Sequence, residues 1–162
     1  MHAVNLTRFN TAPADDLRPL LMNCLAVPRW VDTVLTPRPY DSREALLTAA
    51  GSTAAELSTD EIHQAIADHP RIGEQKAGDQ HSSAEQSGVD TALAARLRAA
   101  NERYEQRFGH IYLVFASGRS GDELLDILES RLTNNPVAEL AVVNAELAKI
   151  TVLRLGKLVT DE

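Results

Sequence analysis

The sequence predicts an all-α fold: a single-domain multi-helix bundle that covers residues 1–162 and contains one extended apolar segment near residues 111–116. Three observations support this prediction. Apolar residues recur every three or four positions along most of the chain, which is the period of an amphipathic helix. Capping and helix-terminating residues separate these stretches. The length of 162 residues and the hydrophobic content of 44% suit one globular domain.

Two helices are expected in the first 35 residues. The first begins around residues 11–13, contains an internal Pro19, and places four apolar positions on one face, namely Leu17, Leu20, Leu21 and Cys24. The second begins at Pro28 and carries Trp30, Val31 and Val34. It must end near Leu35, because the two prolines that follow cannot continue a helix.

Capping signals predict the next two helices. Residues 41–44 read as an N-cap with a supporting acidic residue, and the helix they open is expected to run to about residue 50, where Gly51 ends it. Ser58 and Glu61 form a capping-box pattern, and the helix after them is expected to run to about residue 68. Residues 71–88 are polar and predict a loop with a short helical turn at residues 82–86.

The C-terminal half predicts three helices and the extended segment. Asp90 caps a long helix whose apolar face holds Leu93, Leu97, Ala100, Tyr104 and Phe108, and Gly109 ends it. The apolar run at residues 111–116 has no second strand to pair with, which favours an extended buried segment. A capping box at Ser120 opens a helix to residue 132, and Asn135-Pro136 opens a final helix to about Leu158.

Composition excludes several functional classes. The chain carries 16 Lys and Arg against 23 Asp and Glu, a net charge of −7, which disfavours nucleic acid or an anionic membrane as a partner. The single cysteine, Cys24, excludes an internal disulfide and a cysteine-based metal centre. No apolar stretch approaches the ~20 residues of a membrane span, and no secretion signal precedes residue 11. We expect a soluble cytoplasmic protein.

Two charged or titratable residues lie in register with apolar helix faces. Arg154 follows Leu147 by seven residues, on a stripe with Leu140, Val143, Ile150 and Leu158. It either reaches solvent or pairs with an interior carboxylate, or it binds an anion in a pocket. His69 follows Ile66 by three residues and points inward as Pro70 ends its helix. It is either a structural histidine or an acid–base group.

Glu85 and the histidines allow further interpretations. Ser82-x-x-Glu85 and Ser83-x-x-Gln86 are capping patterns, so local capping is the simplest role of Glu85. The possible metal ligands are His63, His69, His81, Glu85 and His110. Their spacing matches no known ligand pattern, which disfavours a metal site. Phosphate-binding glycine loops and the serine-hydrolase elbow are absent from the sequence.

Four motifs in order resemble one family. They are His69-Pro70-Arg71-Ile72-Gly73, Ala84-Glu85-Gln86, the block from Tyr104 to Arg119, and Lys149-Ile150-x-x-Leu153-Arg154-Leu155. Together with Trp30 and Arg38-Pro39-Tyr40, they resemble the 2-oxo-4-hydroxy-4-carboxy-5-ureidoimidazoline (OHCU) decarboxylase family, from Phe9 to Leu158. The resemblance implies an all-helical homodimer that uses no metal and no organic cofactor. It also implies a role in urate breakdown, yielding (S)-allantoin and CO2 from OHCU.

The resemblance assigns site residues one by one. The catalytic histidine of the family falls on His69, its glutamate on Glu85 and its arginine on Arg154. The substrate-contacting stretches fall on Pro70, Ser82, Ser83, Ala84, Glu85, Gln86, Tyr112, Leu113, Val114, Phe115 and Ala116. His110 stands where many members have phenylalanine, and no role is assigned to it. Two other functions remain open at this point: a metal-dependent amide or ureide hydrolase, and a non-catalytic helical interaction module.

Overall fold

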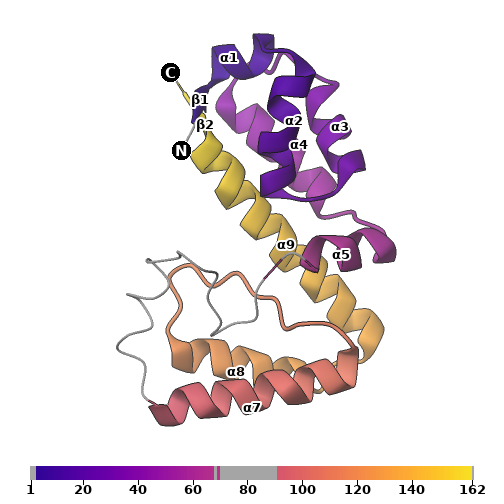
Figure 1. The fold of residues 1–162 in the computed structure, drawn as a ribbon, viewed down its shortest axis with the longest axis vertical. Helices are drawn as coiled ribbons and strands as arrows, with labels where there is room; N and C mark the ends of the chain where they lie inside the picture. Colours follow the sequence, from indigo (N-terminus) through magenta and orange to yellow (C-terminus); the bar gives the residue numbers. More distant parts are fainter. Residues whose placement is uncertain (1–2, 68, 70–90, 162) are drawn as a thin grey trace. The chain divides into compact units, whose positions relative to one another are not determined.

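Helices make up most of the chain, as Figure 1 shows for the computed structural model of the protein, which describes residues 3–67, 69 and 91–161. The all-α prediction is confirmed: 71% of the structure is helical, and a single two-stranded sheet is found in the described part. The chain divides into two compact units, residues 1–65 with 144–162, and residues 66–143. The expectation of one domain over residues 1–162 stays a prediction.

The first unit brings the two ends of the described chain together. Strand β1 (Val4–Asn5) pairs in parallel with β2 (Val159–Thr160), so that Val4 lies opposite Val159 (Figure 1). Between them come α1 (Leu6–Thr11), α2 (Ala14–Cys24), α3 (Pro28–Leu35), α4 (Arg43–Ala54), α5 (Thr59–Ile66) and the C-terminal part of α9 (Pro136–Leu158). Arg43 donates from Nε to the Val159 carbonyl at 2.7 Å and from Nη2 to the Gly156 carbonyl, which holds the end of α9 in place.

Local signals position most of these helices. The predicted limits of α2 and α3 are confirmed, and Pro19 lies inside α2. Ser42 accepts from the N–H of Ala45 and caps α4. The expectation that Gly51 ends this helix is wrong, because α4 continues to Ala54. A Cβ at Gly51 would lie 3.0 Å from Cγ2 of Val152, so this glycine allows α4 and α9 to approach closely.

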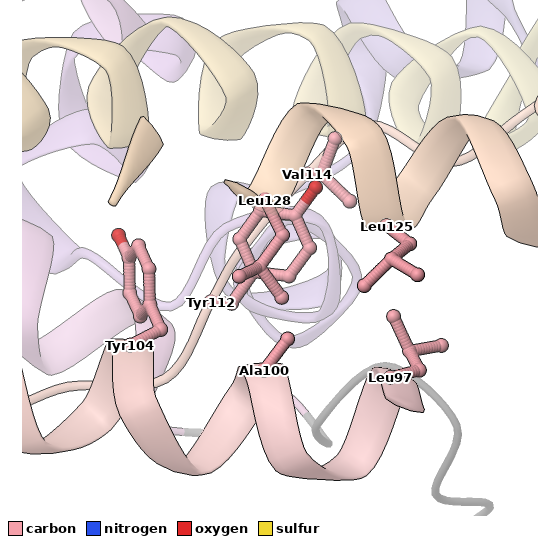
Figure 2. Packing of buried hydrophobic residues seen from close by; sticks show 7 residues of the cluster. All are labelled: Leu97, Ala100, Tyr104, Tyr112, Val114, Leu125 and Leu128. Atoms are coloured by element: carbon pink, nitrogen blue, oxygen red, sulfur yellow. The ribbon is translucent and has the colours of Figure 1, made fainter. Parts of the chain in front are cut away.

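The second unit is built on α7 (Thr91–Phe108) and α8 (Gly121–Arg131), which pack against each other. Their shared core also includes two residues of the segment 111–116, as Figure 2 shows; it consists of Leu97, Ala100, Tyr104, Tyr112, Val114, Leu125 and Leu128. The prediction for residues 111–116 is confirmed: they form neither helix nor strand, and Tyr112, Leu113 and Val114 are buried.

The turns of the second unit follow the predicted signals. Gly109 has φ +79°, a conformation that glycine adopts without strain, and it ends α7. Ser120 and Glu123 form the predicted capping box at the start of α8. Asn135 accepts from the N–H of Ala138 at 2.8 Å and opens α9. No helix among the described residues combines the length and apolar character that crossing a bilayer would need.

Candidate active site

His69 lies at the end of α5, where the sequence predicted it. The reciprocal hydrogen bonds of Ser58 and Glu61 form the capping box that starts this helix. The helix ends at Ile66, earlier than expected, and the N–H of His69 donates to the Ile66 carbonyl at 3.0 Å to close one more turn. Ile62 and Ile66 are buried and His69 is half-buried. This partial burial agrees with the expectation that His69 points inward.

Three hydrogen bonds fix the segment 111–116 against its neighbours. The Tyr112 hydroxyl donates to the Leu124 carbonyl in α8 at 3.0 Å. The Leu113 carbonyl accepts from Nη1 of Arg131 at 2.8 Å. The Phe115 carbonyl accepts from Nε of Arg119 at 3.2 Å. The backbone that the family resemblance assigns to substrate contact is therefore held by side chains as well as by burial.

A buried carboxylate lies behind this segment. Glu139, with a fully buried side chain, accepts hydrogen bonds from the Tyr104 hydroxyl, from Nε of Arg131 at 2.8 Å, from Nη2 of Arg131, and from Nδ2 of Asn134 at 3.0 Å. We call Tyr104, Arg131, Asn134 and Glu139 the Glu139 cluster. The guanidinium of Arg131 also lies 4.9 Å from the centre of the Tyr112 ring and 5.8 Å from that of Tyr104.

The Glu139 cluster shifts the protonation equilibria of its members. Burial lowers the pKa of Arg131, but the hydrogen bonds and charge of Glu139 outweigh this effect and leave that pKa above its ordinary value. Burial, followed by the hydrogen bond to Glu139, raises the pKa of Tyr104. Arg131 is therefore a permanent cation and Tyr104 a neutral donor. Sequence reasoning missed this cluster, because Arg131 and Glu139 stand at helix ends where charged residues are common.

Arg154 lies near the end of α9 and is exposed. Its guanidinium Nη1 is 3.5 Å from the Asn23 carbonyl, at the end of α2. In this part of the helix the buried line runs through Leu147, Thr151 and Leu155, whereas Leu140, Ile150 and Leu158 of the predicted stripe are half-buried. The buried line therefore passes through Leu155 and not through Arg154, and the Arg154 side chain reaches solvent, where it is accessible to an anion.

Cys24 lies beside Arg154 in the same unit. Its side chain is buried, and this burial raises the pKa of the thiol to about 11 even though the positive charge of Arg154 opposes the shift. A thiol with that pKa is protonated near neutral pH and cannot act as a nucleophile there.

The other predicted site residues fall into two groups. Pro70, Ser82, Ser83, Ala84, Glu85 and Gln86 lie outside the described residues. His69 and Arg154 belong to different units, and their meeting in one site stays a prediction. Among the described residues, no group of three His, Cys, Asp or Glu side chains could hold a metal ion. His81, a possible ligand, also lies outside the described part.

One motif of the family resemblance and one departure from it make contacts within their own units. Arg38 donates from Nη1 to the carbonyls of Phe9 and Ala12, at 3.0 and 2.7 Å, and the Tyr40 hydroxyl donates to the Val34 carbonyl at 2.7 Å. His110 is half-buried and stacks on Phe108, with ring centres 6.1 Å apart. Arg38 and Tyr40 thus hold the turn after α3 against α1 and α3 in the first unit.

Comparison with known proteins decides the family. The model of the OHCU decarboxylase family matches residues 10–156, which is most of the chain. The chain belongs to the OHCU decarboxylase family. The resemblance carried by the four motifs is therefore confirmed, and the alignment includes the regions of His69, the segment 111–116 and Arg154.

Individual relatives support this membership. The uric acid degradation bifunctional protein TTL of Arabidopsis thaliana is 30% identical over 86% of the chain, and the match spans 46% of that longer protein. The chain thus spans about half the length of this curated relative. An OHCU decarboxylase of Haloferax volcanii is 23% identical over the full length of both proteins.

Two solved structures have a similar fold. The crystal structure of an OHCU decarboxylase in the presence of (S)-allantoin is 30% identical, with a TM-score of 0.70, over 85% of this chain and 94% of that one. A structure of (S)-allantoin synthase has a TM-score of 0.74 over 94% of this chain and 53% of that one. At 15% identity the second match shows the fold alone.

Proposed function

We propose that this chain is a carboxy-lyase that converts OHCU to (S)-allantoin and CO2 in urate degradation. The observation that carries the proposal is the family match over residues 10–156. The full-length alignment with an OHCU decarboxylase agrees with it, as does the fold shared with an OHCU decarboxylase studied with (S)-allantoin. The chain itself supplies the groups that such a reaction needs: a histidine, an arginine and an ordered backbone segment.

The substrate makes this decarboxylation possible without an added electron sink. One ring carbon carries both the carboxylate and a hydroxyl, and the neighbouring ring carbon is part of a C=N bond. When the bond to the carboxylate breaks, CO2 leaves and the electron pair forms a C=C bond to the neighbouring carbon. The C=N electrons move to the ring nitrogen, which takes a proton. The enol formed in this way then loses its hydroxyl proton, and the neighbouring carbon gains a proton on one face.

The protein has two tasks in this scheme: it holds the carboxylate in a productive orientation and it delivers the proton to one face. We assign the proton transfer to His69, because an imidazole exchanges protons near neutral pH. We assign substrate anion or carbonyl binding to Arg154, which is exposed and has no ion-pair partner among the described residues.

The remaining substrate contacts are assigned to Glu85 and the backbone. Glu85 would accept hydrogen bonds from the ureido N–H groups or orient His69. The flanking residues Pro70, Ser82, Ser83, Ala84 and Gln86 would line the same region. The backbone of the segment 111–116 would hold the ring, and its burial at Tyr112, Leu113 and Val114 makes it a firm support.

The test generates OHCU in situ from urate and records CO2 release together with the chirality of the allantoin formed. The parent protein is expected to accelerate the reaction and to give the S enantiomer. His69→Asn is expected to lose at least ~10²-fold in rate, the contribution of one positioned acid–base group. His63→Asn is the matched control, because His63 is an exposed histidine of α5, the helix that precedes His69. Parent-like CO2 release by folded His69→Asn would remove His69 from the mechanism.

Arg154→Ala tests the anion-binding role. Loss of a charged contact to substrate is expected to raise KM and lower kcat/KM. Lys157→Ala, an exposed cation in the last turn of the same helix, is the control. An unchanged kcat/KM in Arg154→Ala would contradict the assignment.

We also propose that the protein is a homodimer, as the family resemblance implies, and that it is cytoplasmic, as its sequence leads us to expect. Light scattering after size-exclusion chromatography measures the mass in solution. A mass of two chains is expected, and a mass of one chain, 17.7 kDa, at assay concentration would contradict it.

A further inference from the structure

Arg131 contacts both the buried carboxylate and the segment expected to hold the substrate. Its guanidinium uses Nε and Nη2 for Glu139 and Nη1 for the Leu113 carbonyl. A planar guanidinium presents its donors at fixed angles, so fixing two of them on a carboxylate also fixes the direction of the third. The Leu113 carbonyl therefore meets a donor whose position is set by Glu139.

Holding this carbonyl also orients the next amide. Arg38–Pro39 is the cis peptide bond found among the described residues, so the Leu113–Val114 peptide is trans and planar. In a trans peptide the N–H points opposite to the C=O. The N–H of Val114 consequently points away from Arg131.

The burial of this arrangement makes it rigid. The side chains of Arg131 and Glu139 are 6% and 0% exposed, and the Tyr104 and Tyr112 rings lie close to the guanidinium. A buried arginine that broke its pairing would leave an uncompensated charge, which is strongly unfavourable. The segment 111–116 is thus attached to a guanidinium that is buried and fully engaged by its neighbours.

We propose that Arg131, held by Glu139, is a positioning residue of the reaction: it fixes the peptide plane at Leu113 so that the segment 111–116 presents the substrate ring with one face toward the proton donor. This inference rests on the proposed function. It adds residues that touch no substrate and act through the backbone. It predicts that loosening Arg131 affects the handedness of the product, and not only the amount of folded enzyme.

The main test compares two substitutions within the Glu139 cluster. Arg131→Lys keeps a cation for Glu139 but loses the fork that reaches Leu113. Tyr104→Phe is the matched control, because it removes another hydrogen bond to the same carboxylate and leaves the contact with Leu113 intact. Should Arg131→Lys fail to fold, the triple variant Tyr104→Phe/Arg131→Met/Glu139→Leu replaces it. That variant has an apolar cluster in place of the polar one and also lacks the contact with Leu113.

Two measurements are made on each folded variant. Product chirality is recorded with enough enzyme to exceed the spontaneous reaction. Arg131→Lys, or the triple variant, is expected to lose about 10²-fold in kcat/KM, the effect of a small misplacement, and to give allantoin of lower enantiomeric purity. Amide hydrogen exchange at residues 112–116 is expected to accelerate, whereas exchange at Ala100 in α7 is not. Tyr104→Phe is expected to keep parent chirality.

The outcomes separate this proposal from the proposed function. Arg131→Lys or the triple variant with parent chirality and parent kcat/KM would overturn the positioning role, even if the parent enzyme made pure (S)-allantoin. Unchanged exchange at residues 112–116 would overturn the contact on which the role depends. If the parent itself gave racemic allantoin at the spontaneous rate, the proposed function would fail. The exchange rates would then still decide whether Arg131 holds the segment.

Discussion

Replacing Glu139 by glutamine tests the energetic importance of the buried pair. The carboxylate accepts four hydrogen bonds and is the ion-pair partner of Arg131, whose side chain is 6% exposed. Glutamine has nearly the same shape but no charge, so Arg131 would remain as an uncompensated buried cation. Removing one partner of such a pair costs about 3–5 kcal/mol. For a chain of this size, each kcal/mol lowers Tm by ~2–4 °C, which gives a decrease of roughly 6–20 °C.

The assay for Glu139→Gln is unfolding by urea and by heat, followed by circular dichroism, beside the parent. The apolar triple variant is the internal comparison, because well-packed apolar residues often replace a buried ion pair without loss of stability. It is expected to regain most of the free energy of unfolding lost in Glu139→Gln. If Glu139→Gln lowered the free energy of unfolding by less than ~1 kcal/mol, the range of an exposed ion pair, burial of the pair would not make it important for stability.

Two further predictions follow from shifted pKa values in the first unit. The hydrogen bonds of Arg29 and Ser58 lower the pKa of Glu61 from its ordinary 4.5 to about 2. The folded state therefore binds fewer protons than the unfolded chain, and this contribution to stability is lost as the pH falls from about 4.5 to about 2. Acid titration of unfolding should show a steeper decline for the parent than for Glu61→Gln; equal slopes would contradict the shift. Cys24, with a pKa of about 11, should react with iodoacetamide at pH 8 far more slowly in the folded protein than in urea. Equal rates would show that the thiol is not buried.

Features that depend on a few neighbouring residues could be predicted from the sequence. The capping boxes at Ser58 and Ser120, and the start of α9 at Asn135-Pro136, are local patterns with local hydrogen bonds. Helix α1 was missed because six residues are too few to show a period, although the side chain of Asn5 accepts from the N–H of Arg8 as an N-cap.

Features that depend on distant residues could not be predicted in this way. Gly51 reads as a helix end in the sequence, yet its role is set by Val152, a residue distant in the sequence. The Glu139 cluster is a stronger case. Charged residues at the end of one helix and the start of the next are normally solvated. Nothing in the spacing of Arg131 and Glu139 shows that they are enclosed by three neighbouring side chains, those of Tyr104, Tyr112 and Asn134. The pair is covered by side chains from separate parts of the chain, Tyr104 of α7 and Tyr112 of the segment 111–116.

The candidate site shows why register and function must be argued separately. The apolar stripe selected Arg154 because it falls in register with the apolar positions of the last helix, whereas the structure buries Leu155 and leaves Arg154 exposed. A guanidinium that packing does not require, and that has no ion-pair partner among the described residues, is available for a substrate anion. Arg131 is the opposite case, since its donors are already used by Glu139 and Leu113. Of the two arginines, Arg154 is thus suited to binding and Arg131 to positioning. The variants should therefore have different effects. Arg154→Ala should raise KM, whereas Arg131→Lys should change the handedness of the product.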